Sequence, residues 1–148
     1  MRAILQRVHH AEVRVDDAVT GAIDQGLLVF VGCGEGDTED DADQLIETLI
    51  HLRIFADDDG KMNRSLIDVD GQLLVVSQFT LYADTSRGRR PSFMKAMDPG
   101  PAEALYDTFV ERLEDRGIDV ESGMFGEMMD VELCNDGPVT ITLDTDEF

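Results

Sequence analysis

The polar residues best placed for chemistry follow a short apolar run. The segment Leu73–Leu81 reads LLVVSQFTL, so four Leu and Val residues lead directly into a polar end. A run of this length after a glycine is typical of a buried strand. Polar side chains at the end of a buried strand must find hydrogen-bond partners or face a cavity. We therefore predict a binding site at this strand end, formed by Ser77, Gln78, Phe79 and Thr80.

A second unusual segment is Asn135–Thr140, NDGPVT, which places Gly137 and Pro138 between two segments of alternating hydrophobicity. One interpretation is an ordinary hairpin turn. The other is that the Gly-Pro bond is cis, because X-Pro bonds adopt this form far more readily than other peptide bonds. A cis bond turns consecutive carbonyls in the same direction. Rigid carbonyls could then distinguish the two configurations of a bound chiral molecule.

Nucleophilic and metal chemistry have weaker support in the sequence. Ser77 and Thr80 could act as nucleophiles, but no general base is evident beside either of them. A triad assembled in space stays open at this stage, because its members need not be neighbours in the sequence. The histidines do not stand at metal-ligand spacing with one another or with a cysteine: His9, His10 and His51. We therefore predict no metal and no cofactor.

Two other motifs are interpreted as turns. The glycines of GCGEG lack the spacing of a phosphate loop, and Glu39, Asp40 and Asp41 after them would repel phosphate. The segment Asp57–Gly60 lacks the two end carboxylates of a calcium loop. Phe125, between Met124 and Gly126, is either a core residue or the wall of a pocket.

Composition predicts one domain spanning residues 1–148. The chain has 148 residues of which 43% are hydrophobic, enough for one core. It contains no apolar run long enough to span a membrane and no apolar segment typical of a signal peptide. Its two cysteines, Cys33 and Cys134, are expected to be free thiols in a reducing compartment, which predicts a cytoplasmic protein.

The charge is strongly acidic and unevenly distributed. The net charge is −20, from 32 acidic and 12 basic residues, and we interpret the scattered acids as adaptation to a salty cytoplasm. The segment 61–95 is the exception, because it contains six basic residues and only three acidic ones. It is either a loop whose cations pair with nearby acids or a contact for RNA phosphates. The cations proposed for RNA contact are Lys61, Arg87, Arg89, Arg90 and Lys95.

The pattern of apolar residues predicts an α+β fold. Strands are expected over 2–8, 11–15, 19–23, 27–31 and 73–77, with two more on either side of the NDGP turn. One amphipathic helix is expected after Thr38, with Asp41 completing a capping box. A second helix is expected from Pro99 to a C-terminal cap at Gly117. The helices should cover one face of a mixed, mostly antiparallel, barrel-like sheet.

Taken together, the motifs resemble the D-aminoacyl-tRNA deacylase family along the whole chain. The similar segments are SQFT (77–80), NDGPVT (135–140), GKMN (60–63), RPSF (90–93), the N-terminal strand with Arg7, and Gly123-Met-Phe125 followed by Met129. The resemblance implies a homodimeric hydrolase that cuts the ester between a D-amino acid and the 3′-terminal adenosine of tRNA. It also implies removal of glycine from mischarged tRNA for alanine.

The resemblance also assigns roles to residues. It implies that Ser77–Thr80 form the floor of the pocket, and that Gly137 and Pro138 reach into the partner subunit's pocket and reject L-amino acids through their carbonyls. Arg7 would support that loop, while Phe125 and Met129 would form pocket walls. Attack would come either from Thr80 or from water assisted by the 2′-hydroxyl of the RNA. We favour the second, with backbone amides near Phe79 and Thr80 orienting the ester.

Two rival functions remain at this stage. A non-catalytic nucleic-acid-binding protein would use the basic segment 61–95, but it would give no role to Gly137 and Pro138. An editing module of a synthetase would remove an L-amino acid, although the chain carries no synthetase domain.

Overall fold

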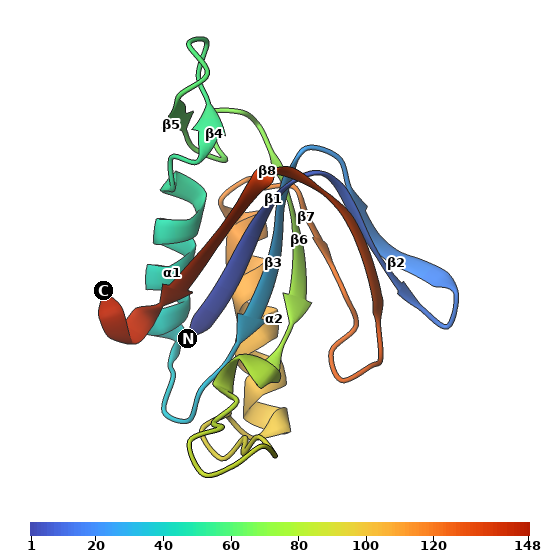
Figure 1. Cartoon of the computed structure of the whole chain (residues 1–148), viewed down its shortest axis with the longest axis vertical. Coiled ribbons are helices and arrows are strands. Elements are labelled where there is room, and N and C mark those ends of the chain that lie inside the picture. The colour runs from blue at the N-terminus through green and yellow to red at the C-terminus, as the bar shows by residue number, and fades with distance from the viewer.

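The computed structural model describes all residues, 1–148. The sequence expectation of an α+β fold with two helices is confirmed (Figure 1). In chain order the elements are β1 (Arg2–Val15), β2 (Ala18–Ile23), β3 (Gly26–Gly32), α1 (Glu39–His51), β4 (Phe55–Ala56), β5 (Met62–Arg64), β6 (Gln72–Ser77), the 3₁₀ turn η1 (Phe79–Tyr82), α2 (Pro99–Asp115), β7 (Val120–Ser122), β8 (Asp130–Asp144) and the 3₁₀ turn η2 (Thr145–Glu147).

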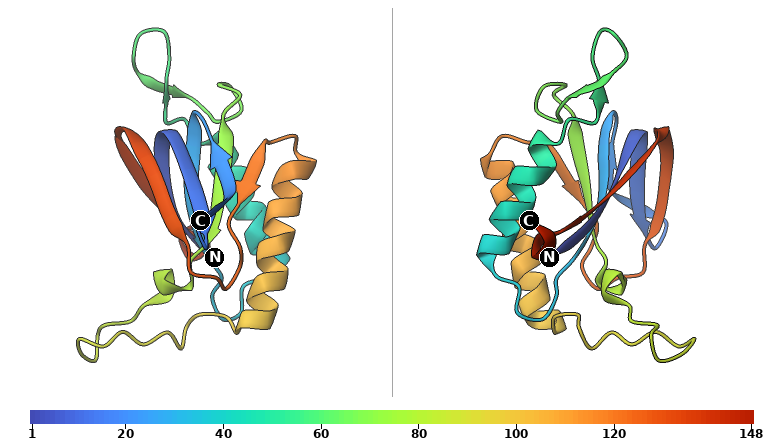
Figure 2. Two further views of the ribbon diagram at one scale, coloured as in Figure 1. Left: turned by 90° about the vertical axis from the view of Figure 1, so that its right-hand side faces the viewer. Right: turned by 60° about the vertical axis from the view of Figure 1, so that its left-hand side comes forward.

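The main sheet is mixed, and β1 is its organising strand. Its order is β2-β1-β3-β6-β7, and β8 also pairs with β1. The first half of β1 pairs with β3, the second half pairs with β2, and β8 follows both halves. All of these pairs are antiparallel, whereas β3–β6 and β6–β7 are parallel. Because one long strand changes partners along its length, the sheet curls into a barrel-like shape (Figures 1 and 2).

The NDGP segment differs from the expected turn between two strands. Residues 130–144 form the single strand β8, which follows β1 on both sides of the motif. The register shifts where Gln6 pairs with Thr140 but Val8 pairs with Asn135. The extra residues on β8 bulge out of the ladder, so the motif is a bulge within one strand. Alternating hydrophobicity could not reveal this, because β1 accepts both halves on the same edge.

The helices pack together on one face of the sheet, as Figure 2 shows. Helix α1 begins with the predicted capping box, in which the backbone N–H of Thr38 donates to Asp41 Oδ2 at 2.8 Å. Helix α2 has proline in its first turn, and Gly117 follows its end with φ of 78°. The apolar stripes of both helices lie against β1, β3 and β6, and form the larger hydrophobic core with them.

A second, smaller core lies on the other face of the sheet, inside the curl. It contains Val8, Ala11, Val13, Ile23, Leu28, Leu74 and Val76. Partly buried residues close it, including Phe30, Met129 and Val131. The strand β6 therefore faces both cores, which explains why its sequence is continuously apolar before Ser77.

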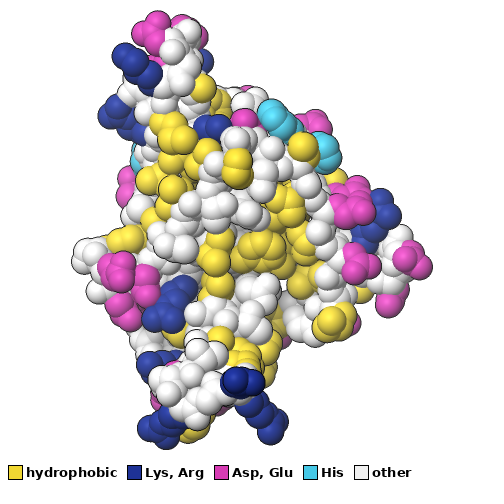
Figure 3. Space-filling view, viewed as in Figure 1, with side chains coloured by type: hydrophobic (Ala, Val, Ile, Leu, Met, Phe, Trp, Pro, Cys, Tyr) yellow, Lys and Arg dark blue, Asp and Glu magenta, His cyan; other side chains and the backbone are white.

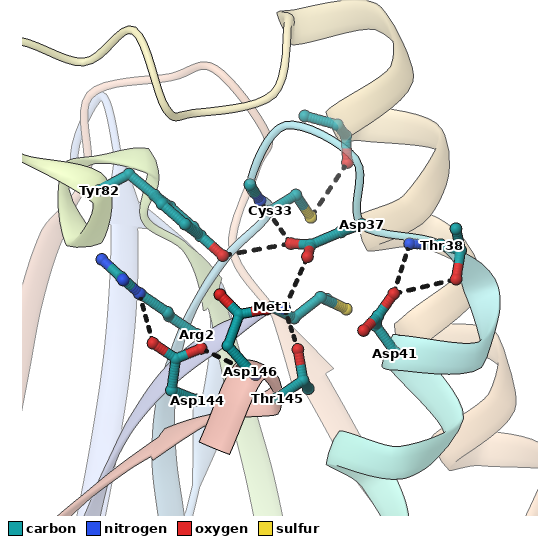
Figure 4. A network of polar contacts seen from close by, with 12 residues as sticks. Met1, Arg2, Cys33, Asp37, Thr38, Asp41, Tyr82, Asp144, Thr145 and Asp146 are labelled. Atoms are coloured by element: carbon teal, nitrogen blue, oxygen red, sulfur yellow. Dashed lines mark hydrogen bonds and ion pairs between the residues drawn. The ribbon is translucent and has the colours of Figure 1, made fainter. Parts of the chain in front are cut away.

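A polar network joins the chain termini to the loop before α1 (Figure 4). The α-amine of Met1 lies 2.9 Å from Asp37 Oδ1 and also donates to Thr145. Asp37 Oδ2 accepts from the hydroxyl of Tyr82 at 3.2 Å, and Arg2 lies over the Tyr82 ring while pairing with Asp144. This network fixes η1, which contains Phe79 and Thr80 of the predicted site. No helix combines the length and hydropathy needed to cross a membrane.

Candidate active site

A cavity of about 650 Å³ opens at the carboxyl end of β6, and most of its lining is apolar. The parallel pairing of β3 with β6 brings the ends of both strands to this edge of the sheet. The segment after β6, the start of α2 and residues 125–129 complete the lining. We call the whole segment Gly123–Met129, to which these residues belong, the 123–129 wall. Exposed hydrophobic side chains are also visible in the middle of the molecular face in Figure 3.

All four residues predicted from the SQFT motif line this cavity: Ser77, Gln78, Phe79 and Thr80. The side-chain amide of Gln78 donates to the hydroxyl of Thr80. The hydroxyls of Ser77 and Thr80 form no hydrogen bond with an imidazole or a carboxylate. A hydroxyl without a base remains a weak nucleophile at neutral pH. The geometry thus favours the use of these residues to position a substrate.

Two backbone amides of the motif are unpaired. The turn η1 starts at Phe79, and Leu81 N–H is its first amide to find a backbone acceptor, the carbonyl of Gln78. The N–H groups of Phe79 and Thr80 are the first two of this 3₁₀ turn, so they have no acceptor within it, and no turn, loop or side-chain group accepts from them. Unpaired amides at the edge of a cavity can donate to an oxygen that develops negative charge. Such a pair can therefore orient an ester and stabilise its tetrahedral intermediate.

The 123–129 wall contains Phe125 and Met129, which the sequence also placed in the pocket, and both line the cavity. The Phe125 ring packs against Tyr106 of α2, with ring centroids 5.9 Å apart. Opposite them, Phe79 and Phe93 meet edge to face with centroids 5.0 Å apart. The rings of Phe79, Phe93 and Phe125 therefore line the cavity, which suits a flat or apolar group.

The remaining predicted residues, Gly137, Pro138 and Arg7, do not line this cavity. Arg7 pairs with Leu27 at one end of β3, whereas Ser77 pairs with Val31 near the other end. The positions of Arg7 and Ser77 are therefore roughly 13 Å apart along the strand direction, at about 3.3 Å per residue. The β1 and β3 strands also lie between β8 and β6. Gly137 and Pro138 are exposed, and the bond between them is cis.

Arg7 holds the NDGP bulge in place. Its guanidinium bonds to the carbonyl and the carboxylate of Asp136, and another of its nitrogens donates to the carbonyl of Ile54. Gly137 has φ of 133°, a conformation that other residues rarely adopt. A Cβ at this position would meet Val139 at 2.9 Å. The bulge is therefore a fixed, outward-facing feature.

The predicted RNA contacts separate into two groups. Arg87, Arg89, Arg90 and Lys95 belong to the segment between η1 and α2, residues 83–98, which we call the basic loop. Lys61 lies at the β4–β5 hairpin, at the opposite end of the molecule (Figure 1). Arginines that pair with carboxylates lie outside the basic loop: Arg2, Arg7, Arg14, Arg64, Arg112 and Arg116.

The cations of the basic loop are exposed and unpaired, and the loop borders the cavity through Phe93. Dark blue side chains are visible at this end of the molecule in Figure 3. Backbone hydrogen bonds between Asp84 and Ser92, and from Glu35 N–H to the carbonyl of Lys95, hold the loop at its base. The protein as a whole is acidic, but the basic loop gives its cavity a positively charged border.

Sequence reasoning missed several lining residues, which come from four different segments: Phe30, Cys33, Phe93, Met97, Asp98 and Glu127. The end of the apolar strand 27–31 was a usable signal for Phe30, because parallel strands end at the same edge of a sheet. Burial, with a smaller effect from Asp37, raises the pKa of the Cys33 thiol to about 11. No group of three or more His, Cys, Asp or Glu side chains is arranged to hold a metal ion.

Comparisons with known proteins agree with the motifs. The profile of the D-Tyr-tRNA(Tyr) deacylase family matches residues 4–144. A D-aminoacyl-tRNA deacylase from Bacillus pumilus is 56% identical over 99% of this chain and 100% of its own length. One from Thermus aquaticus is also 56% identical, over 99% of this chain and 97% of its own.

Solved structures show the same fold. A c-Myc DNA unwinding element binding protein superposes with a TM-score of 0.92 at 36% identity, and the match covers 97% of this chain and 98% of that one. A "probable eukaryotic D-amino acid tRNA deacylase" superposes with a TM-score of 0.81 at 21% identity, over 96% and 97% of the two chains, a likeness of fold alone.

Proposed function

The chain belongs to the D-Tyr-tRNA(Tyr) deacylase family, and we propose that it hydrolyses the ester between a D-amino acid and the 3′-terminal adenosine of tRNA. The observation that carries this proposal is the pair of unpaired amides at Phe79 and Thr80 on the edge of a largely apolar cavity. These amides are suited to bind the ester carbonyl. Because tRNA charging supplies the substrate, we place the reaction in the cytoplasm.

In this proposal the protein contributes positioning and charge stabilisation. The amides of Phe79 and Thr80 donate to the carbonyl oxygen, which becomes negative when water attacks, and they stabilise it in a site from which much water is excluded. No base is bonded to Thr80, so the 2′-hydroxyl of the terminal ribose is assigned to relay the proton. It accepts a proton from the attacking water and passes its own proton to the 3′-oxygen, which leaves as the ribose hydroxyl when the ester bond breaks. Holding the ester and the ribose together lowers the entropic part of the barrier.

Rejection of L-amino acids is assigned to Gly137 and Pro138 of a second copy of the chain. The bulge is exposed and lies at the other end of the sheet from the Ser77 edge of the same chain. A homodimer would therefore supply each cavity with the partner subunit's bulge, whose carbonyls accept the amino group of a D-substrate only. Glycine has no side chain to reject, so glycyl-tRNA for alanine would be accepted on the same ground.

Contact with the body of the tRNA is assigned to the basic loop. Its four cations are exposed and lack carboxylate partners, and the loop that carries them borders the cavity through Phe93. Lys61 at the distant hairpin would contact the same RNA only if the partner subunit brings it there. A protein that only binds nucleic acid would also use the basic loop, but it would have no need of the cavity.

The direct test is hydrolysis of D-Tyr-tRNA and L-Tyr-tRNA side by side, at low and at molar salt. We expect rapid release of D-tyrosine, slow release of L-tyrosine and activity retained at molar salt. A pure phosphate binder would instead lose tRNA steeply as salt rises and would cleave neither ester. Binding without cleavage of either ester would contradict the proposal.

A further inference from the structure

Tyr106 contacts the catalytic edge of the sheet without lining the cavity. It lies on the buried face of α2 and is 3% exposed. Its hydroxyl donates to the carbonyl oxygen of Val75 at 2.9 Å. Val75 precedes Ser77 by two residues on β6, so this bond fixes the strand directly before the SQFT motif.

The same carbonyl also fixes the 123–129 wall. Gly123, the first residue of the wall, donates its N–H to Val75 O at 3.0 Å. A Cβ on Gly123 would lie 2.5 Å from Met129 Sδ, so the two ends of the wall are folded closely against each other. The carbonyl of Val75 on β6 therefore accepts hydrogen bonds from both helix α2 and the 123–129 wall.

The ring of Tyr106 makes the third contact. It packs against Phe125 in the middle of the wall, with a centroid separation of 5.9 Å and an interplanar angle of 49°. One side chain thus contacts the strand that carries the ester-binding amides and the wall that faces them. Burial also raises the pKa of Tyr106, which keeps the hydroxyl protonated as a donor.

We propose that Tyr106 is a positioning residue that sets the distance between the 123–129 wall and the SQFT strand end, and so controls turnover. Without its hydroxyl, the Val75 carbonyl keeps only the Gly123 amide, and the Tyr106 ring that packs against Phe125 is no longer bonded to β6. Small displacements of the groups that hold a substrate lower rates by large factors. This inference rests on the proposed deacylase function.

The test compares Tyr106→Phe with Tyr82→Phe. The chain has two tyrosines, and both are buried with a bonded hydroxyl, but the Tyr82 hydroxyl bonds to Asp37. We expect Tyr106→Phe to lower kcat on D-Tyr-tRNA about tenfold, as a wall misplaced by a fraction of an ångström would. Tyr82→Phe should lower the melting temperature and leave the 123–129 wall in place, because its hydroxyl bonds to Asp37 and not to Val75.

Methionine methyl NMR supplies a readout that needs no substrate. Met124, Met128 and Met129 belong to the wall, whereas Met62 lies on β5. We expect Tyr106→Phe to shift the wall signals and leave that of Met62 in place. If the protein proves inactive on D-Tyr-tRNA, the proposed function fails, while these spectra still decide whether Tyr106 positions the wall.

Rescue separates the hydrogen bond from ring packing. Tyr106→4-aminophenylalanine keeps a donor and should restore both kcat and the wall signals. Unchanged wall signals in Tyr106→Phe, or equal displacement of the wall signals in both tyrosine variants, would overturn the proposal. If Tyr106→Phe does not fold, Gly123→Ala tests the same wall from its other attachment. If that variant displaces the wall signals but keeps the wild-type kcat, the wall does not control turnover and the proposal fails.

Discussion

Arg7 and Asp136 are joined through both the backbone and the side chain of the aspartate. Arg7 Nε lies 3.1 Å from the carbonyl oxygen of Asp136 and 3.2 Å from its carboxylate. The side chain of Arg7 is 11% exposed, so solvent competes little for these bonds. The residue next to this anchored aspartate is Gly137. The orientation of the exposed Gly137 and Pro138 carbonyls therefore depends on an arginine in the middle of β1.

Arg7→Lys should relax rejection of L-amino acids. Lysine keeps the charge but loses the fork that bonds two oxygens and Ile54 at once. A loss of about 1 kcal/mol in loop positioning would raise relative hydrolysis of L-Tyr-tRNA roughly fivefold. Rates on both isomers check this, with Arg14→Lys on the same strand as the control. Unaltered selectivity with a lower melting temperature would show that Arg7 serves stability alone.

The shared site of the proposed dimer can be tested by mixing two variants. Gly137→Ala forces a Cβ to within 2.9 Å of Val139 at a φ of 133°, so it should displace the bulge and allow L-Tyr-tRNA hydrolysis. Ser77→Trp should fill its own cavity and be inactive alone. Excess Ser77→Trp subunits carry intact bulges, so they should restore L-rejection to the Gly137→Ala cavities.

Kinetics of subunit-exchanged mixtures measure this effect. D-Tyr-tRNA hydrolysis should persist while L-Tyr-tRNA hydrolysis falls as Ser77→Trp is added. If L-hydrolysis simply follows the amount of Gly137→Ala protein, the bulge acts within its own chain or not at all.

Thr80→Ala should retain much of the turnover. The Thr80 hydroxyl is bonded to Gln78 and has no base, whereas its backbone N–H survives the substitution. We expect kcat within about tenfold of wild type, because loss of a true nucleophile lowers rates by about 10⁴ or more. Single-turnover hydrolysis of D-Tyr-tRNA measures this. Near-complete loss of turnover with normal tRNA binding would make Thr80 the nucleophile.

Neutralising the basic loop should weaken the salt dependence of tRNA binding. Each of Arg87→Ala, Arg89→Ala and Arg90→Ala removes one unpaired cation. When a cation no longer neutralises its phosphate, the slope of log K against log salt becomes shallower by about 0.7 to 0.9. Binding titrations at several salt concentrations check this, with Arg112→Ala as a control because Arg112 pairs with Glu39 and Asp43. A slope that stays at the wild-type value would place the RNA elsewhere.

Cys33 should make the protein less stable in alkali. Burial raises the pKa of its thiol from 9.0 to about 11, so between these values the unfolded chain releases a proton that the folded chain retains. The stabilisation is complete below pH 9 and is lost as the pH rises through 11. Unfolding free energies from about pH 8 to 11 should therefore fall more steeply for wild type than for Cys33→Ala. Equal slopes would contradict this. Iodoacetamide at about pH 8 should modify exposed Cys134 and spare Cys33.

The sequence was sufficient to predict both helices, most strands of the main sheet and six of the nineteen residues that line the cavity. The apolar run before Ser77 and the capping box at Thr38 are local patterns, and each produced its element. The SQFT residues could be placed because polar side chains at the end of an apolar run have few alternatives to lining a cavity. Phe125 was assigned to the pocket only by the family resemblance. Family motifs then identified the chemistry.

Which of these residues meet depends on the tertiary structure. The sequence suggested two strands around a turn, but β1 accepts residues 130–144 as one bulged strand because it is long enough to pair with both halves. In the sequence, 61–95 also reads as one basic segment. In the structure the chain runs from the β4–β5 hairpin through β6 to the far end of the sheet, so Lys61 is separated from the basic loop. Contacts between distant segments depend on register and sheet curvature. Local hydrophobic patterns do not encode these long-range relations.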